Sequence, residues 1–178
     1  MMLGFSQVDV FAGERYRGNP VAVVHDADAL GTEEMARFAR WTNLSETTFL
    51  LKPTVKNADY RLRIFTPGGE LPFAGHPTLG SCHAWLEQGG VPTQSTNIVQ
   101  ECGAGLVRFR RAPQGLAFAA PALLRTGPLE PALVSKLLVA LGLKATDIVS
   151  HQWVDNGPGW CALLLDSAQR VLDLVPDL

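Results

Sequence analysis

The chain has little cysteine and lacks long hydrophobic runs. Its 178 residues include only 3 cysteines, Cys82, Cys102 and Cys161, none in the C-x-x-C spacing typical of zinc ligands or redox pairs. This argues against a zinc site and a disulfide framework, and it favours a reducing compartment. The apolar segments are too short to cross a membrane. We therefore expect a cytoplasmic protein with no metal site and no membrane partner.

The chain also lacks a basic excess. Lys and Arg number 15 against 17 Asp and Glu, so the formal net charge is −2, and the basic residues are dispersed along the sequence. Binding to phosphates needs a basic surface, so we expect no nucleic-acid partner. Hydrophobic residues make up 47% of the sequence, which is enough to form a globular core.

The stretch over residues 60–90 carries the most informative pattern. Residues 60–65 alternate as a strand does, and a Pro-Gly-Gly turn follows. A helix is then predicted over residues 76–89, where a Gly-Gly pair stops it. Apolar side chains cover most of the circumference of this helix, whereas a surface helix needs only one apolar face. We therefore expect a central helix enclosed by sheet.

The start of this helix is suited to anions. We place Pro77 at the first helical position, where its missing N–H removes no hydrogen bond. The backbone N–H groups of Gly75, His76 and Thr78 are then expected to be free, because the first N–H groups of a helix have no intrahelical partner. Free N–H groups and the helix dipole both attract negative charge.

The rest of the first part of the chain predicts short strands, short connections and few helices. A helix is expected to start at Thr32 as N-cap and to end at Asn43. The pattern indicates an α+β fold with a mostly antiparallel sheet rolled around the central helix. The strands are predicted over residues 4–12, 21–24, 47–51, 98–99, 106–110 and 116–119.

A second unit is expected after a proline-rich stretch that begins at Pro121. We predict a first domain over residues 1–121 and a second over residues 122–178. The second is expected to hold a helix over 133–141, paired strands over 148–154 and 160–165, and one more helix.

The second unit has an internal similarity to the first. Residues 18–30 and 156–169 both place a Gly/Asn/Pro turn before an apolar strand that exits through Asp and Ala. A helix is expected to follow each segment, but the second unit has no counterpart of the central GHPTLG helix. We therefore expect an incomplete second copy of the first unit.

Two side chains are candidates for acid–base chemistry. Glu46 lies at the mouth of a predicted strand between apolar neighbours, a setting in which a carboxylate can serve as a general acid or base. His76, at a helix N-terminus, is expected to stay neutral. Ser45, Gly75 and Thr78 would supply donors to a substrate carboxylate. Taken singly, a strand Glu is more often solvated and a helix-start His more often a cap, so structural roles stay open.

Other candidates are weaker. Cys82 lies on the apolar stripe of the central helix, which favours a buried structural thiol over a nucleophile. His83 and His151 lack partners at metal-ligand spacing. Asp155 precedes an Asn-Gly-Pro turn and is expected to stabilise that turn.

Several motifs, in this order and spacing, are similar to those of the phenazine-biosynthesis PhzF-like isomerases, which have a diaminopimelate epimerase-like fold. The resemblance covers nearly the whole first unit and continues in the VDNGPGW turn of the second. The motifs are QVDVF (7–11), GNPVAVV (18–24), NLSETTF (43–49), YRLRIFTP (60–67) and ELPFAGHPTLG (70–80).

The resemblance implies a cofactor-independent isomerase that binds a small carboxylic acid between two pseudo-symmetric units. Glu46 matches the family's catalytic glutamate, which takes a proton from one carbon and returns one elsewhere. We assign Glu46 and His76 as catalytic. The residues assigned to substrate binding are Ser45, Gly75, Pro77, Thr78 and Asn19.

The resemblance also implies a second Gly-rich helix start, which the chain does not reach. We therefore expect a truncated chain with one half of the cleft and doubtful activity by itself. The alternative is a non-catalytic homologue that binds a small anion or a protein partner through the exposed half-cleft. Apolar surface on the incomplete second unit predicts self-association, for example as a homodimer.

Overall fold

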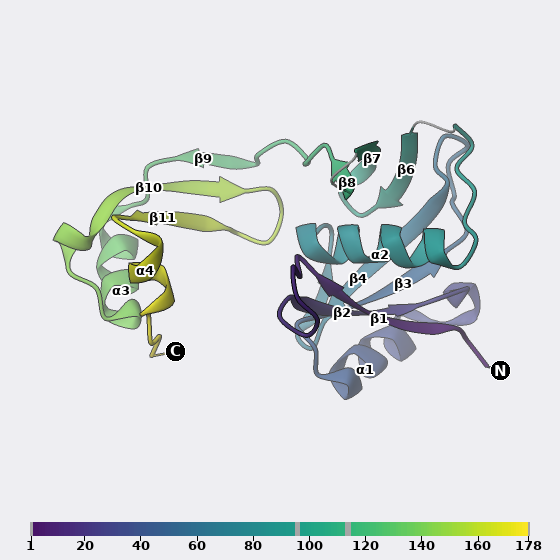
Figure 1. Ribbon diagram of the computed structural model, residues 1–178, viewed down its shortest axis with the longest axis horizontal. Helices are drawn as coiled ribbons and strands as arrows, with labels where there is room; N and C mark the ends of the chain where they lie inside the picture. Colours follow the sequence, from purple (N-terminus) through teal and green to yellow (C-terminus); the bar gives the residue numbers. More distant parts are fainter. Residues whose placement is uncertain (1, 95–96, 113–114, 178) are drawn as a thin grey trace. The chain divides into compact units, whose positions relative to one another are not determined.

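The computed structural model describes residues 2–94, 97–112 and 115–177, which fall into two compact units, residues 1–121 and 122–178. Each unit has a β-sheet of its own (Figure 1). The elements of the first unit are β1 (Phe5–Val10), β2 (Asn19–Val24), α1 (Thr32–Thr42), β3 (Glu46–Leu51), β4 (Tyr60–Thr66), β5 (Gly69–Leu71), α2 (Gly75–Glu87), β6 (Asn97–Cys102), β7 (Gly105–Ala112) and β8 (Gly115–Phe118).

The sheet of the first unit has the order β1-β2-β3-β4-β6-β7-β8, and β5 pairs with β4. Neighbouring strands are antiparallel except for the parallel pairs β2–β3 and β4–β6. The chain crosses through α1 in the first parallel pair and through α2 in the second. These helices lie on opposite faces of the sheet (Figure 1). The α+β fold with a mostly antiparallel sheet is therefore confirmed.

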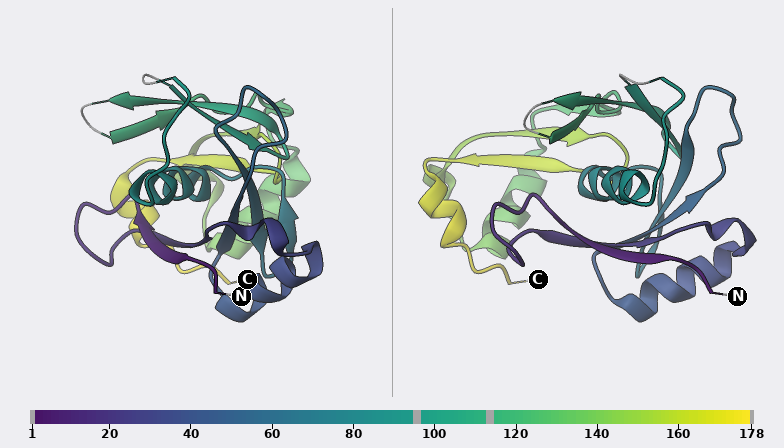
Figure 2. Two further views of the ribbon diagram at one scale, coloured as in Figure 1. Left: turned by 90° about the vertical axis from the view of Figure 1, so that its right-hand side faces the viewer. Right: turned by 45° about the vertical axis from the view of Figure 1, so that its right-hand side comes forward.

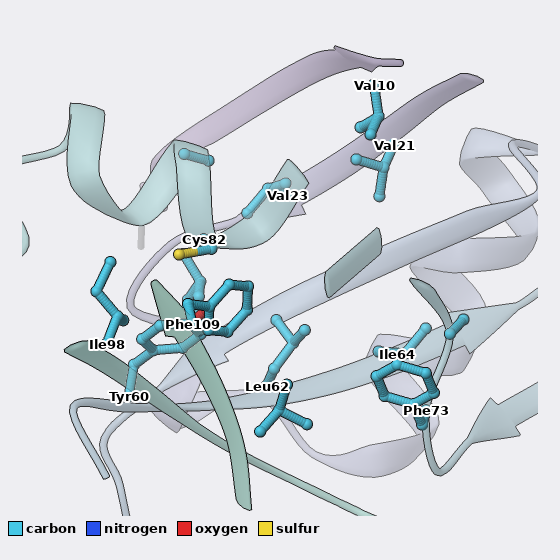
Figure 3. Packing of buried hydrophobic residues seen from close by; sticks show 14 residues of the cluster. Val10, Val21, Val23, Tyr60, Leu62, Ile64, Phe73, Cys82, Ile98 and Phe109 are labelled. Atoms are coloured by element: carbon cyan, nitrogen blue, oxygen red, sulfur yellow. The ribbon is translucent and has the colours of Figure 1, made fainter. Parts of the chain in front are cut away.

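The sheet curls around α2. In Figure 2, α2 lies between β1–β2 on one side and β6–β8 on the other. The expectation of a central helix enclosed by sheet is therefore confirmed. Its buried apolar surface packs against the concave face of the sheet (Figure 3). This core includes Val10, Val21, Val23, Leu50, Tyr60, Leu62, Ile64, Phe73, Cys82, Ile98, Val107 and Phe109.

A smaller core lies between α1 and the convex face of the sheet. Met35 and Ala39 are the buried residues of α1, and they pack with Val24, Phe49 and Phe65. In β4, Phe65 thus points to this convex core, while its neighbour in sequence points to the concave one. Helices α1 and α2 thus pack against opposite faces of β4, so Phe65 and the residue before it are both buried although they point in opposite directions.

A glycine allows α2 to approach the sheet closely. A Cβ atom at Gly80 would lie 2.5 Å from Val21 Cγ1 and 2.8 Å from Val10 Cγ2, closer than real Cβ contacts. The backbone of α2 therefore packs directly on the side chains of β1 and β2. Any larger residue at this position would push the helix away from the sheet.

Hydrogen bonds between buried polar side chains fix the position of α2 on the sheet. Ser81 Oγ lies 2.8 Å from Thr48 Oγ1, and this hydroxyl pair is buried. Three residues earlier in α2, Thr78 makes a second buried contact: the Tyr60 hydroxyl donates to Gln100 Oε1 at 3.0 Å, and Gln100 Nε2 donates to Thr78 Oγ1 at 3.3 Å. Because buried polar groups must find partners, these hydrogen bonds allow only one position of α2 on the sheet.

The helix ends differ from the prediction by one or two residues. The helix α2 spans Gly75–Glu87 rather than 76–89, because the N–H of Gly90 turns back to the carbonyl of Trp85. Pro77 is the third helical residue, not the first. Helix α1 begins at Thr32 and has Gly31 as N-cap, whose N–H donates to the Glu34 carboxylate, so the expected Thr32 cap was wrong. The strand β5 was missed because it is a short hairpin arm.

The second unit holds β9 (Arg125–Gly127), α3 (Pro131–Leu141), β10 (Ile148–Asp155), β11 (Cys161–Leu165) and α4 (Ala168–Leu172). Its antiparallel sheet has the order β11-β10-β9. The predicted helix and strand pair are present, whereas β9 was not predicted. The Asp155 carboxylate accepts the N–H groups of Gly157 and Gly159, which holds the turn between β10 and β11 as expected.

In the part of the chain that the structure describes, no helix combines the length and the apolar character that a membrane span needs.

Candidate active site

The candidate site forms where two parallel strands and a helix begin. In the parallel pair β2–β3, Val21 lies opposite Glu46, so the residues that precede them reach the same edge of the sheet. Asn19 is the first residue of β2, and Ser45 directly precedes β3. The register of this one strand pair therefore brings together two segments that are more than twenty residues apart in the sequence.

The helix adds His76 to this edge. His76 and Gly80 are four residues apart, so they lie on the same face of α2. Since Gly80 packs against Val21 and Val10, the imidazole one turn earlier lies over the start of β2. Buried Phe73 and Ala74 fix the chain just before the helix. The position of His76 thus follows from the close packing of α2.

The central feature is the pair formed by Glu46 and His76. The His76 Nε2 atom lies 3.4 Å from the Glu46 Oε2 atom. The side chains are only 9% and 13% exposed, for His76 and Glu46 respectively. Both atoms are buried, and neither has a hydrogen bond to another described residue. Buried polar atoms without partners are uncommon and are often found where a ligand or a reacting group binds.

Burial keeps the imidazole of His76 neutral. Its pKa is lowered mainly by desolvation, and this effect exceeds the opposite effects of the Glu46 charge and of the Pro20 carbonyl, which favour the protonated ring. The contact is therefore an approach of a neutral imidazole to a carboxyl group. Its 3.4 Å distance is longer than a good hydrogen bond. Such contacts in active sites often tighten only when substrate is bound.

Asn19 and Ser45 extend the pair toward solvent. Asn19 Nδ2 lies 3.2 Å from His76 Nδ1, on the side of the ring opposite to Glu46. The Ser45 hydroxyl donates to Asn19 Oδ1 at 3.4 Å. Asn19 and Ser45 are exposed, so this end of the site is open to water or substrate. The structure thus brings together four of the predicted site residues.

The remaining predicted residues are placed differently. Gly75 and His76 are the first two residues of α2, so their N–H groups precede the first intrahelical bond. Thr78 was expected to offer a free N–H, but its N–H donates to the Ala74 carbonyl at 3.2 Å. Its hydroxyl is buried and accepts from Gln100. Pro77 is buried as well. The expected free N–H of Thr78 is therefore wrong, whereas substrate contacts of Thr78 and Pro77 stay a prediction.

Cys82 is not part of this site. It is buried in the concave core, and desolvation raises the pKa of its thiol to about 12. A thiol of this kind is neutral and a poor nucleophile at neutral pH. The expectation of a structural thiol is therefore confirmed. Among the described residues, no three His, Cys, Asp or Glu side chains are grouped as ligands of a metal ion.

Sequence reasoning missed the residues that set the position of the site. Gly80 permits the close approach of α2, and Ser81 anchors the helix through Thr48. A glycine and a serine inside an otherwise apolar helix were the available signal, since both weaken an isolated helix. Their role became visible only when the opposing strands were in place.

Two parallel-strand ends, a helix N-terminus and a buried carboxyl–imidazole pair thus meet at one edge of the sheet in an α+β fold. The family model described as "Phenazine biosynthesis-like protein" matches residues 8–178. The chain belongs to this PhzF-like family, and the resemblance stated from its motifs is confirmed.

Curated relatives support the assignment. The chain is 46% identical over 182 residues to Antisense-enhancing sequence 1 of Schizosaccharomyces pombe, covering 97% of the chain and 60% of the relative. It is 40% identical over 175 residues to the trans-2,3-dihydro-3-hydroxyanthranilate isomerase of Pseudomonas aeruginosa, covering 96% of the chain and 60% of the relative. The chain thus spans 60% of the length of these relatives.

A solved structure shows the same fold. The crystal structure of the Bacillus anthracis phenazine biosynthesis protein of the PhzF family matches with a TM-score of 0.78 and 25% sequence identity. The match covers 99% of this chain and 60% of that chain. The diaminopimelate epimerase-like fold expected from the sequence is therefore confirmed.

Proposed function

We propose that the first unit supplies the acid–base half of a PhzF-like isomerase that needs no cofactor and acts on a small carboxylic acid. Glu46 is the base that takes a proton from a substrate carbon and the acid that delivers a proton to another carbon. His76 holds the Glu46 carboxyl group in place. The free N–H groups of Gly75 and His76 bind the substrate carboxylate at the helix N-terminus.

One observation carries this proposal. The Oε2 atom of Glu46 and the Nε2 atom of His76 are both buried, lie 3.4 Å apart and lack any other hydrogen-bond partner among the described residues. A purely structural carboxylate would be expected to be solvated or to accept strong hydrogen bonds. Here it is withdrawn from bulk water, yet it lies beside an end of the sheet where Asn19 and Ser45 are exposed.

The proposed reaction is an isomerisation without net oxidation. The C–H bond at one carbon breaks, and its proton goes to the Glu46 carboxylate. The electron pair left on carbon forms a new double bond, and the π electrons of the old double bond shift toward the second carbon. That carbon takes a proton from Glu46, which restores the carboxylate. Protons and electrons balance within the substrate and one side chain.

The second half of the site is proposed to come from elsewhere in a complete protein, because the chain spans 60% of the length of its curated relatives. Residues 122–178 are then the start of a second unit that resembles the first. The alternative is that the half-site binds a small anion or a protein partner without turnover. The free helix N-terminus at Gly75 and His76 would serve that role equally well.

The test compares two matched variants of the protein in the form that its own gene produces. Glu46→Gln removes the proposed base, and Glu33→Gln makes the same chemical change at an exposed residue of α1. The probe substrate is trans-2,3-dihydro-3-hydroxyanthranilate, which the Pseudomonas aeruginosa relative is named for. We expect Glu46→Gln to lower turnover by about 10²- to 10⁴-fold and Glu33→Gln to leave it unchanged.

The outcomes separate the two candidate functions. Loss of turnover in the Glu46→Gln variant alone supports the isomerase. Turnover that survives in this variant contradicts the role of Glu46. Binding of a small carboxylate without turnover in the unaltered protein supports the binding function instead.

A further inference from the structure

The side chain of Asn19 contacts His76 and Ser45, and these contacts bear on which ring nitrogen of His76 carries a hydrogen. Its side-chain nitrogen lies 3.2 Å from His76 Nδ1, and its side-chain oxygen accepts from the Ser45 hydroxyl at 3.4 Å. An amide nitrogen can only donate a hydrogen bond. In this arrangement Nδ1 of His76 is the acceptor, and it carries no hydrogen. In the same orientation the Ser45 hydroxyl donates to the amide oxygen.

The other side of the imidazole leads to the same assignment. Nε2 faces the Oε2 atom of Glu46 at 3.4 Å. An ionised carboxylate only accepts hydrogen bonds, so a bare Nε2 would place two acceptors against each other in a buried site. A neutral imidazole carries one hydrogen, and these two neighbours together place it on Nε2.

We propose that Asn19 is a positioning residue that holds His76 in the tautomer protonated at Nε2 and so keeps the transferred proton on Glu46. This inference rests on the proposed acid–base function. When Glu46 takes a proton from substrate, Nε2 of His76 already carries a hydrogen and cannot accept it. The ring could become charged only by protonation at Nδ1, which faces the N–H of the Asn19 amide. Glu46 therefore remains the acid for the second step.

This role differs from that of a substrate ligand. A binding residue changes substrate affinity, whereas a residue that sets a tautomer changes the chemical step. Asn19 is exposed, but its two side-chain hydrogen bonds are both made to protein groups. Asn19 sets which ring nitrogen of His76 carries the hydrogen. In metal sites, the group bonded to the free ring nitrogen of a histidine ligand fixes the tautomer in the same way.

The direct test is the protonation of each His76 nitrogen, measured by two-bond ¹H–¹⁵N NMR of the chain labelled with ¹⁵N-histidine. His76→Gln assigns the signal, and the remaining three histidines report whether each variant is folded. We expect a protonated Nε2 and a bare Nδ1 in the unaltered chain. Asn19→Asp places an acceptor against Nδ1 and should move the hydrogen to Nδ1. Asn19→Leu, which is similar in size, should give a mixture of tautomers.

A protonated Nδ1 in the unaltered chain, or the same pattern in Asn19→Asp, overturns the proposal. The activity measurement adds an independent readout: Asn19→Leu should lower kcat by about 10- to 100-fold with little change in KM. A raised KM at unchanged kcat would show a substrate ligand instead. Failure of the proposed function is a different result, namely turnover in Glu46→Gln, and it leaves the NMR outcome unaffected.

Discussion

His76 Nε2 lies 3.4 Å from Glu46 Oε2, although one residue begins a strand and the other lies in the first turn of a helix thirty residues later. The contact depends on two separate features of the fold. The parallel register of β2 and β3 places Glu46 opposite Val21, and Gly80 lets α2 pack against the same valine. The contact between Glu46 and His76 is therefore a direct product of the packing between one helix and two strands.

The first prediction concerns this packing. Gly80→Ala places a Cβ atom 2.5 Å from Val21 Cγ1, so the helix must shift away from the sheet. Alanine in a helix normally stabilises it relative to glycine, but here we expect a loss of about 1–3 kcal/mol from overpacking. Urea denaturation of the chain measures it. Gly13→Ala, whose Cβ would meet no described atom within 4 Å, is the matched control. Equal stabilities of the two variants would contradict the close approach of α2.

The second prediction concerns pH. Burial lowers the pKa of His76 from the ordinary value of 6.5, so the unfolded chain binds a proton at this residue more readily than the folded chain. The stabilising contribution of the neutral ring is complete above pH 6.5 and is lost as the pH falls toward the folded-state pKa. His25, also buried, behaves in the same way.

Denaturation between pH 7 and pH 5 measures this effect, and the free energy of unfolding should fall toward acid. His76→Gln should reduce the slope, and adding His25→Gln should reduce it further. A slope that is unchanged by both substitutions would show that neither imidazole is held neutral by the fold.

The third prediction concerns the thiols. Cys82 is buried and its pKa is about 12, whereas Cys102 and Cys161 are partly exposed. A maleimide reagent at pH 8 should modify Cys82 last in the folded chain and all three thiols in denaturant. Mass spectrometry of peptides measures the order. Early modification of Cys82 would contradict its burial and would reopen a thiol-based mechanism.

The fourth prediction concerns self-association, which stays a proposal. Val149 in β10 and Leu164 in β11 are 62% and 58% exposed, so the second unit presents apolar surface to solvent. The double variant Val149→Ser/Leu164→Ser should weaken association by about 10-fold or more, measured by sedimentation. Val91→Ser, at an exposed valine of the first unit, is the control. A monomer at every concentration would contradict the proposal.

The fold was largely predictable because its strands and the helix α2 have strong local patterns. Alternating residues in β4 predicted a strand, and the apolar circumference of α2 predicted an enclosed helix. The helix ends and the fate of Thr78 were not predictable. Whether its N–H is free depends on where the first helical turn closes, and whether its hydroxyl is buried depends on Gln100, more than twenty residues later.

The site was predictable only in part. Residue types and the family resemblance suggested Glu46, His76, Ser45 and Asn19, which the structure brings together. The sequence could not show that Asn19 bonds to the imidazole rather than to a ligand. That contact depends on the register of β2 with β3 and on the distance between α2 and these strands, both of which are tertiary properties.

The most direct test of the proposed proton transfer is the incorporation of solvent deuterium. The protein in its native form is allowed to convert trans-2,3-dihydro-3-hydroxyanthranilate in D₂O, and the product is analysed by NMR. Asn19 and Ser45 are exposed at this end of the site, so the carboxyl proton of Glu46 can exchange with D₂O before it is delivered. Deuterium at one product carbon with the unaltered protein and with Glu33→Gln, and none with Glu46→Gln, is the predicted result. Equal incorporation with the Glu46→Gln variant would contradict the assignment of Glu46 as the group that moves the proton.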